Sequence, residues 1–323
     1  MVIVGPTAAG KSALAMQLAE ARSLSIISAD SRQVFKGFDV GTAKPSVADR
    51  ARVPHYGIDV VAPTEAYSAY AWASDATAWS QQATQQHRPP LIVGGTGFYI
   101  RALLSPLNDL PRADPTRRTA LQRWLDMLDD VEVARWCRAL DPARAELGKT
   151  QRLRAIETAL LSGRRLSEFH ATPKAPRRTA RYLVIDPGPI LAERIRVRVA
   201  TMVAAGWIDE VAALGTRVSH DARAWKASGY STIRDYVEGR LDRSTAIERV
   251  TIETRQYAKR QRTWFRHQLH EGPVTALNPD APDAFRRAYL YLSHHGGATC
   301  TESDPHCSVC PLLKECPEGQ KRA

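Results

Sequence analysis

Residues 5–12, GPTAAGKS, fit the pattern G-x-x-x-x-G-K-[ST] of a phosphate-binding loop. In such a loop the backbone N–H groups surround a diphosphate, the lysine neutralises its charge and the serine hydroxyl faces Mg²⁺. An apolar run at residues 1–4 precedes the loop and SALAMQLAEA follows it with helical spacing, which is the required order of strand, loop and helix. Kinases, GTPases and some transferases all use this loop, so it predicts diphosphate binding without naming the reaction. The candidate diphosphate-binding residues are Gly5, Pro6, Thr7, Ala8, Ala9, Gly10, Lys11 and Ser12, with Mg²⁺ on Ser12.

A carboxylate follows the next apolar run of the chain. Asp30 ends the stretch LSIISAD, which we expect to form the second strand of the sheet. The carboxyl end of a strand beside a phosphate-binding loop lies over the crevice where α/β sheets bind ligands. Asp30 is therefore expected to face the phosphates, as a Mg²⁺ ligand, as a base toward a nucleophile, or as a cap for the next turn.

Composition indicates a globular protein with a polyanionic partner. The 323 residues are 44% hydrophobic, and 45 Lys+Arg against 34 Asp+Glu give a net charge of +11. This balance suits nucleic acid, although basic proteins without such a partner are common. No apolar run approaches the roughly 20 residues of a membrane span, and no basic-then-apolar leader precedes the loop. We therefore expect a cytoplasmic enzyme with no membrane contact.

Four parts follow one another along the chain. Short apolar runs alternate with helical stretches over residues 1–111 and resume over residues 182–287, which predicts an α/β fold with a parallel sheet and helices on both faces. Residues 112–181 are helical, charged and poor in strands, with 16 Lys+Arg against 9 Asp+Glu, a net +7. They predict an inserted helical module, with a solvated helical face as the alternative. Residues 288–323 form a cysteine-rich tail.

Six blocks carry a resemblance to a known family. They are GPTAAGKS, ISADSRQVFKGFDVGTAKP, VPHYGIDV, LIVGGTGFYIRALL, SGYSTIRDY and TRQYAKRQRTWFR. In this order and at these separations they resemble the tRNA dimethylallyltransferases over about residues 1–277, and the second and last blocks are far more specific than the loop. The resemblance implies that the loop holds the diphosphate of dimethylallyl diphosphate as a leaving group. The acceptor would be the adenosine 3′ of the anticodon in tRNA, and no ATP would be consumed.

The resemblance also assigns roles near the diphosphate. Asp30 matches the family's base, which takes a proton from the adenine amine as the new C–N bond forms. Lys11, the loop N–H groups and Mg²⁺ on Ser12 would stabilise charge on the departing diphosphate. Thr96, in the turn GGTG, would face both the diphosphate and the tRNA, with an ordinary glycine turn as the alternative. Lys226 stands where some members carry an arginine aimed at the diphosphate, and lysine lacks the bidentate fork.

Contacts to the tRNA anticodon stem-loop are implied by two further stretches. The target base must turn out of its stack to reach the donor, and single-stranded loop bases are the usual point of RNA recognition. Residues matching Asp30, Ser31, Arg32 and Gln33 contact the turned-out base and its neighbours in the family. The inserted module resembles the arm that grips the anticodon stem. Its block TQRLRAIE is one residue shorter than usual, so Gln151, Arg152 and Arg154 are expected tRNA contacts without fixed individual roles.

Four of the five cysteines lie in the last 24 residues. Cys300, Cys307, Cys310 and Cys316 have six, two and five residues between them, a spacing at which four thiolates can surround one metal centre. The spacing resembles the iron-sulfur loop of endonuclease III and the adenine DNA glycosylases. It implies a four-iron four-sulfur cluster, with zinc as the competing metal and an inert remnant as a third alternative.

Three other functions compete with prenyl transfer to tRNA. The chain could prenylate free adenine nucleotides, or it could be a nucleotide kinase with a phosphate-binding loop, for which the +7 module is excessive. It could also be a non-enzymatic iron-sulfur module that binds nucleic acid through its tail. We expect the protein to act as a monomer.

Overall fold

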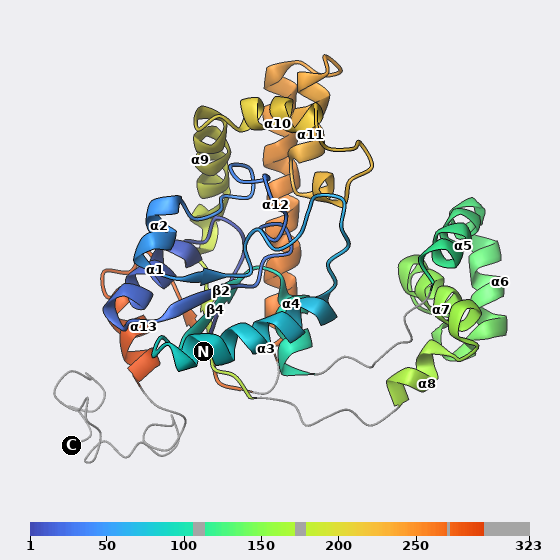
Figure 1. The fold of residues 1–323 in the computed structure, drawn as a ribbon, viewed down its shortest axis with the longest axis horizontal. Helices are drawn as coiled ribbons and strands as arrows, with labels where there is room; N and C mark the ends of the chain where they lie inside the picture. Colours follow the sequence, from blue (N-terminus) through green and yellow to red (C-terminus); the bar gives the residue numbers. More distant parts are fainter. Residues whose placement is uncertain (106–113, 172–178, 270–271, 294–323) are drawn as a thin grey trace. The chain divides into compact units, whose positions relative to one another are not determined.

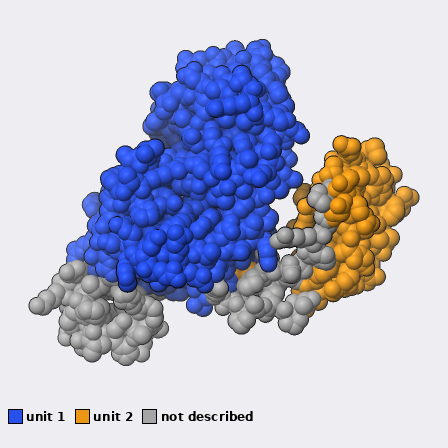
Figure 2. Space-filling view, viewed as in Figure 1, with its two compact units in different colours: residues 1–104, 178–323 blue, residues 105–177 orange. Residues whose placement is uncertain are grey.

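The computed structural model describes residues 1–105, 114–171, 179–269 and 272–293. The chain divides into two compact units, coloured separately in Figure 2. The first joins Met1–Leu104 to the chain from Arg178 onward, and the second is Ser105–Arg177. The second unit is thus an insertion within the first.

A six-stranded parallel sheet is the centre of the first unit (Figure 1). Its order is β3-β2-β4-β1-β5-β6, and Ile3 of β1 pairs with Val93 of β4 and Leu183 of β5. The four inner strands β2, β4, β1 and β5 are mostly apolar and largely buried, as expected where helices cover both faces of a parallel sheet. The strands are β1 (Val2–Val4), β2 (Ser25–Ser28), β3 (His55–Tyr56), β4 (Pro90–Gly94), β5 (Tyr182–Ile185) and β6 (Val274–Leu277).

Helices pack on both faces of this sheet. On one face, α1 (Lys11–Ala21) and α13 (Ala284–Ser293) lie side by side, and Leu18 packs in one cluster with Ile3 and Leu91 of the strands. Neighbouring residues of a strand point to the opposite face. There α3 (Ala69–Gln85) contacts β2 and β4, and its Trp72 Nε1 donates to the carbonyl of Ser28 at 3.0 Å. The predicted α/β sheet with helices on both faces is confirmed.

Further helices of the first unit follow the sheet strands along the chain. α12 is the longest of the described helices, with 26 residues, and its N-terminus is capped by the Asp242 side chain. The bounds are α2 (Val47–Arg52), α4 (Gly97–Leu104), α9 (Leu191–Ala204), α10 (Trp207–Gly215), α11 (Tyr230–Val237) and α12 (Arg243–Gln268), with 3₁₀ turns η2 (Gly188–Ile190) and η3 (Arg223–Lys226). No helix in the described ranges combines the length and apolar character needed to cross a membrane.

The second unit is helical and has a core of its own. Val133, Cys137 and Ile156 are fully buried in it, and Trp124 packs edge-on against Trp136. Its elements are α5 (Pro115–Met127), α6 (Asp130–Leu140), η1 (Pro142–Arg144), α7 (Lys149–Ser162) and α8 (Leu166–Ala171). The sequence expected helices here, between residues 112 and 181.

Two details differ from the sequence expectation. Residues 190–214 carry one continuous helical pattern in the sequence, which predicts a single long helix. The structure has two helices there, because the chain turns at Gly206, whose φ of 92° is a left-handed conformation that interrupts an α-helix. The helix α13 also runs across residue 288, where the tail was expected to begin. Ala284 and Ala288 are buried against α1 in the core of the first unit.

Candidate active site at the carboxyl edge of the sheet

The loop of residues 5–12 connects β1 to α1 and leaves the N-terminus of that helix open. A Cβ on Gly5 would stand 2.2 Å from the carbonyl oxygen of Ile185, so the loop presses directly on β5. Gly10 is the N-cap, with φ 93° and no side-chain cap, and no acidic residue occupies the first turn of α1. The first N–H groups of a helix have no intrahelical acceptor and favour anions. This end of α1 can therefore receive a phosphate.

Lys11 lies at the same helix end. Its Nζ donates to the carbonyl of Pro6 at 2.8 Å, so the ammonium folds back over the loop. Burial, together with the charge of Arg198, lowers its pKa to about 8, and the Asp30 carboxylate opposes both effects. A lysine that is crowded by another cation gains most from a bound anion, which would restore its usual proton affinity.

Asp30 follows β2 directly and is fixed in a tight turn. Its Oδ1 accepts the backbone N–H of Arg32 at 2.8 Å, and the next N–H, of Ser31, donates to Thr96 Oγ1 at 3.0 Å. The N–H of Thr96 donates in turn to the carbonyl of Ala29. Since β2, β4 and β1 are adjacent in the sheet, Asp30, Thr96 and Lys11 come from the carboxyl ends of three neighbouring strands.

Two phenols, one buried and one half-buried, share the surroundings of Asp30. Burial and the Asp30 carboxylate raise the pKa of Tyr99 and of Tyr257 to about 12. Tyr257, from α12, also contacts Thr96. Tyr257 was not among the site residues expected from the sequence, but the structure places it beside the carboxylate and the GGTG turn.

Gln261 of α12 joins the two loops of the site and was missed from the sequence. Its Oε1 accepts the N–H of Thr7 at 2.8 Å, and its Nε2 donates to the carbonyl of Gly95 at 2.9 Å. The buried positions of α12 include Ala258 and Phe265, and Gln261 lies between them on the same face. A glutamine on the apolar face of a helix was the signal that could have identified it.

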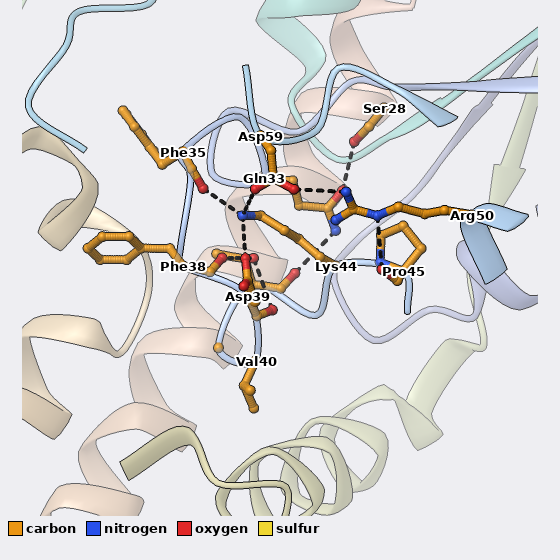
Figure 3. A network of polar contacts seen from close by, with 12 residues as sticks. Ser28, Gln33, Phe35, Phe38, Asp39, Val40, Lys44, Pro45, Arg50 and Asp59 are labelled. Carbon is orange, nitrogen blue, oxygen red and sulfur yellow. Dashed lines mark hydrogen bonds and ion pairs between the residues drawn. The ribbon is translucent and has the colours of Figure 1, made fainter. Parts of the chain in front are cut away.

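An ionic network around the buried Lys44 holds the chain that follows Asp30 (Figure 3). The Lys44 side chain is 2% exposed and donates to the carbonyl of Phe35 at 2.6 Å, to Asp39 at 2.6 Å and to Asp59 at 2.5 Å. Arg50 donates to the other oxygen of Asp59 at 2.8 Å. Burial alone would raise the pKa of Asp59, but the hydrogen bonds from Lys44 and Arg50 outweigh it, so the net shift is downward.

Gln33 belongs to the same network. Its Oε1 accepts the Ser28 hydroxyl at 2.8 Å, and its Nε2 donates to the carbonyls of Thr42 and Ala43 at 3.2 and 3.1 Å. Its amide is thus bonded to the protein at both ends. In contrast, the half-buried Arg32 makes no side-chain hydrogen bond or ion pair with another described residue.

The other predicted contact residues lie outside these hydrogen-bond networks. Lys226 is exposed on η3, and no hydrogen bond or ion pair joins its side chain to another described residue. Gln151, Arg152 and Arg154 occupy the start of α7 in the second unit, where Gln151 and Arg154 are exposed and Arg152 is half-buried. The four tail cysteines, Cys300, Cys307, Cys310 and Cys316, lie outside the described residues.

Mg²⁺ fits the residues of the loop. Ser12 presents an exposed hydroxyl at the open end of α1, and no cluster of three acidic, histidine or cysteine side chains occurs among the residues that the structure describes. Mg²⁺ commonly keeps several waters and binds through one or two protein oxygens together with substrate phosphates. A single hydroxyl beside a diphosphate site is such a donor set.

Comparisons with known proteins identify related families and proteins. A family model described as IPP transferase matches residues 33–268, and one described as isopentenyl transferase matches residues 1–53. A tRNA dimethylallyltransferase of Halorhodospira halophila is 43% identical over 286 residues, which cover 85% of this chain and 92% of the relative. One of Deinococcus radiodurans is 39% identical over 305 residues, which cover 90% and 96%.

Solved structures also match this chain over most of its length. A tRNA isopentenylpyrophosphate transferase from Bacillus halodurans is 30% identical with a TM-score of 0.64, over 90% of this chain and 94% of that one. A eukaryotic dimethylallyltransferase acting on tRNA is 25% identical with a TM-score of 0.75, over 89% and 76%. With the family model covering most of the chain and close relatives matched over nearly their full length, this chain belongs to the tRNA dimethylallyltransferase family.

Proposed function

We propose that this protein transfers the dimethylallyl group of dimethylallyl diphosphate to the N6 amine of the adenosine 3′ of the anticodon in tRNA, and releases diphosphate. The observation that carries the proposal is the convergence of Asp30 with Lys11 at the uncapped end of α1. A carboxylate and an anion site at one sheet edge are what an amine and an allylic diphosphate require of an enzyme.

The residues divide the reaction between them. The N6 lone pair forms a bond to the allylic carbon while the C–O bond to the diphosphate breaks, and its electron pair leaves with the diphosphate oxygen. Asp30 acts as the base that accepts the proton lost by the amine, and the N–H of Arg32 holds its carboxylate in place. Lys11 and the N–H groups of the loop stabilise the negative charge of the departing group. Ser12 would hold Mg²⁺, which supplies further neutralisation of that charge.

Recognition of tRNA uses both units in this proposal. Arg32 has a guanidinium without a protein partner among the described residues, so it is the side chain most available for a base edge beside Asp30. Ser31 and Thr96 contact each other next to the same carboxylate, whereas Gln33 shapes the following loop through its bonded amide. Lys226 would add charge near the diphosphate. In the second unit, Gln151, Arg152 and Arg154 would contact the anticodon stem, giving affinity that falls steeply with salt.

The acceptor assay tests this function. The protein is incubated with Mg²⁺ and labelled dimethylallyl diphosphate, together with tRNA, AMP, or ATP and a small acceptor. We expect label on tRNA alone and no ATP turnover. Label on AMP alone would instead support a prenyltransferase for free nucleotides, and phosphate transfer from ATP would support a nucleotide kinase. Either result would refute the proposal, as would the failure of all acceptors.

We further propose that the protein is cytoplasmic and acts as a monomer. Sedimentation at micromolar concentration tests the oligomeric state.

The cysteine tail supports a separate proposal from its spacing. Cys300, Cys307, Cys310 and Cys316 would hold a four-iron four-sulfur cluster with a structural role, because four thiolates at these separations suit one. Anaerobically purified full-length protein should be brown, with iron and sulfide in equal amounts. A colourless preparation with stoichiometric zinc would overturn the cluster in favour of a zinc site.

A further inference from the structure

Glu210, on α10, holds the segment of residues 38–44 that follows the turn of Asp30. Its Oε2 accepts the backbone N–H groups of Asp39 and Val40 at 2.9 and 2.7 Å, and its Oε1 accepts that of Gly41 at 3.5 Å. Successive N–H groups that converge on one anion form a binding nest. The segment is therefore closed around a charge that another element supplies.

Tyr230, on α11, bonds both to this carboxylate and to the segment. Its hydroxyl donates to Glu210 Oε1 at 2.6 Å and accepts the N–H of Gly41 at 3.1 Å. Tyr230 is fully buried, and burial together with the Glu210 carboxylate raises the pKa of the phenol, which therefore keeps its proton. A Cβ on Gly41 would stand 2.1 Å from Trp207 Nε1, so the backbone lies directly against α10. The phenol, the carboxylate and the segment thus fix one another.

The segment in turn holds Gln33 (Figure 3). The carbonyls of Thr42 and Ala43 accept hydrogen bonds from the Gln33 amide nitrogen. The amide oxygen accepts the hydroxyl of Ser28, which is the last residue of β2. Residues 30–32 lie between Ser28 and Gln33, and they carry the base and the expected contacts to the turned-out adenine. A shift of the segment would therefore move the turn that carries these groups.

We propose that Glu210 is a positioning residue for the acceptor, and that it holds the segment so that Ser31 and Arg32 face the bases of the anticodon loop. This inference rests on the proposed function, because it takes an adenine of that loop as the acceptor. Without the carboxylate, three N–H groups lose their acceptor and the segment has to reorganise to satisfy them. Within the described chain, no hydrogen bond joins Glu210 to residues 5–12, so binding of the donor should not depend on it.

Binding of two anticodon stem-loops to the full-length protein, measured by fluorescence anisotropy without donor, tests the proposal. One loop carries adenosine 3′ of the anticodon, and the other lacks the bases at that position and at its 5′ neighbour but keeps every phosphate. We expect Glu210→Gln to weaken binding of the first loop by roughly threefold to tenfold, because the amide keeps one acceptor oxygen but turns an NH₂ group toward the donors of the segment. Binding of the abasic loop should change by less than about twofold, since its phosphate contacts remain. Asp209→Asn changes the exposed carboxylate next to Glu210 and should affect neither loop.

The pair of loops separates positioning from a purely structural role. A carboxylate that only stabilised the fold would, when replaced, weaken both loops equally and also weaken binding of Mg²⁺ with inorganic diphosphate in calorimetry, and this result would overturn the proposal. Unchanged binding of the first loop by Glu210→Gln would overturn it as well. Tyr230→Phe keeps the carboxylate but removes its phenol partner, so it should weaken the first loop alone, and it replaces Glu210→Gln if that variant does not fold. Equal binding of the two loops by the wild type would refute the proposed acceptor, and with it the basis of this inference.

Discussion

Replacing Gln261 by leucine should remove the hydrogen bonds that join the phosphate-binding loop to the GGTG turn. Gln261 is 6% exposed, and it alone joins the N–H of Thr7 to the carbonyl of Gly95. Leucine is similar in volume, so the change mainly removes two hydrogen bonds. Each buried group left without a partner costs about 1–3 kcal/mol. Because Thr7 is half-buried and water can reach its N–H, we expect a total near the lower end, about 2–3 kcal/mol.

Urea unfolding at pH 7 measures this loss, and single-turnover prenyl transfer measures its effect on chemistry. The matched control is Gln256→Leu, which changes an exposed glutamine on the same helix and should alter the unfolding free energy by less than about 0.5 kcal/mol. Gln261→Glu keeps an acceptor for Thr7 but sets a carboxylate against the Gly95 carbonyl. This variant should therefore bind dimethylallyl diphosphate more weakly than the wild type and should also be less stable. If Gln261→Leu matched its control in both assays, the bridge would contribute nothing and the reasoning would be refuted.

Three other variants test separate parts of the account. Asp30→Asn should keep tRNA affinity and lose about 10²–10⁴-fold in turnover, the range for a general base, and unchanged turnover would remove Asp30 from that role. Asp59→Asn tests the network of Lys44 and Arg50 by urea unfolding at several pH values. Since the fold lowers the pKa of Asp59, its stabilisation is present above the unfolded value of about 3.9 and is lost as pH falls through the lower folded value. The gap between wild type and Asp59→Asn should thus shrink below about pH 4, and a gap that widens there would contradict the network. Asp242→Ala should cost about 1 kcal/mol by uncapping α12, which Asp242→Ser should restore.

The inner strands and the phosphate-binding loop could be predicted from the sequence, because short local patterns of residues mark them. The apolar runs around Ile3 and Ile27 mark strands by composition alone, and a lysine after a glycine-rich turn marks the phosphate-binding loop. Asp30 was placed correctly beside β2, since the carboxyl ends of parallel strands meet at one edge. The edge strands were missed. β3 has only two residues, and Val274 of β6 is half exposed, so neither forms an apolar run.

The bonding partners within the site required the tertiary fold. Arg194, Arg196 and Arg198 alternate along α9 as they would on a solvated helix, and only packing against Ala8 decides which of them turns inward. The sequence gives no partner for the Gln33 amide, whereas in the structure it donates to the carbonyls of Thr42 and Ala43, in the loop that ends at Lys44. Local sequence patterns identify the types of residue in the site, whereas long-range contacts determine which hydrogen bonds they make.

The central claim is that an adenine amine beside Asp30 reacts with an allylic carbon whose diphosphate is bound at the N-terminus of α1. Two anticodon stem-loops test it most directly, identical except that one carries adenosine 3′ of the anticodon and the other inosine, which lacks the 6-amine. Each is incubated with the protein, Mg²⁺ and dimethylallyl diphosphate, and its mass is measured. The account predicts one added dimethylallyl group on the adenosine loop and none on the inosine loop. Equal addition to both loops, or addition to neither while free AMP is prenylated, would contradict it.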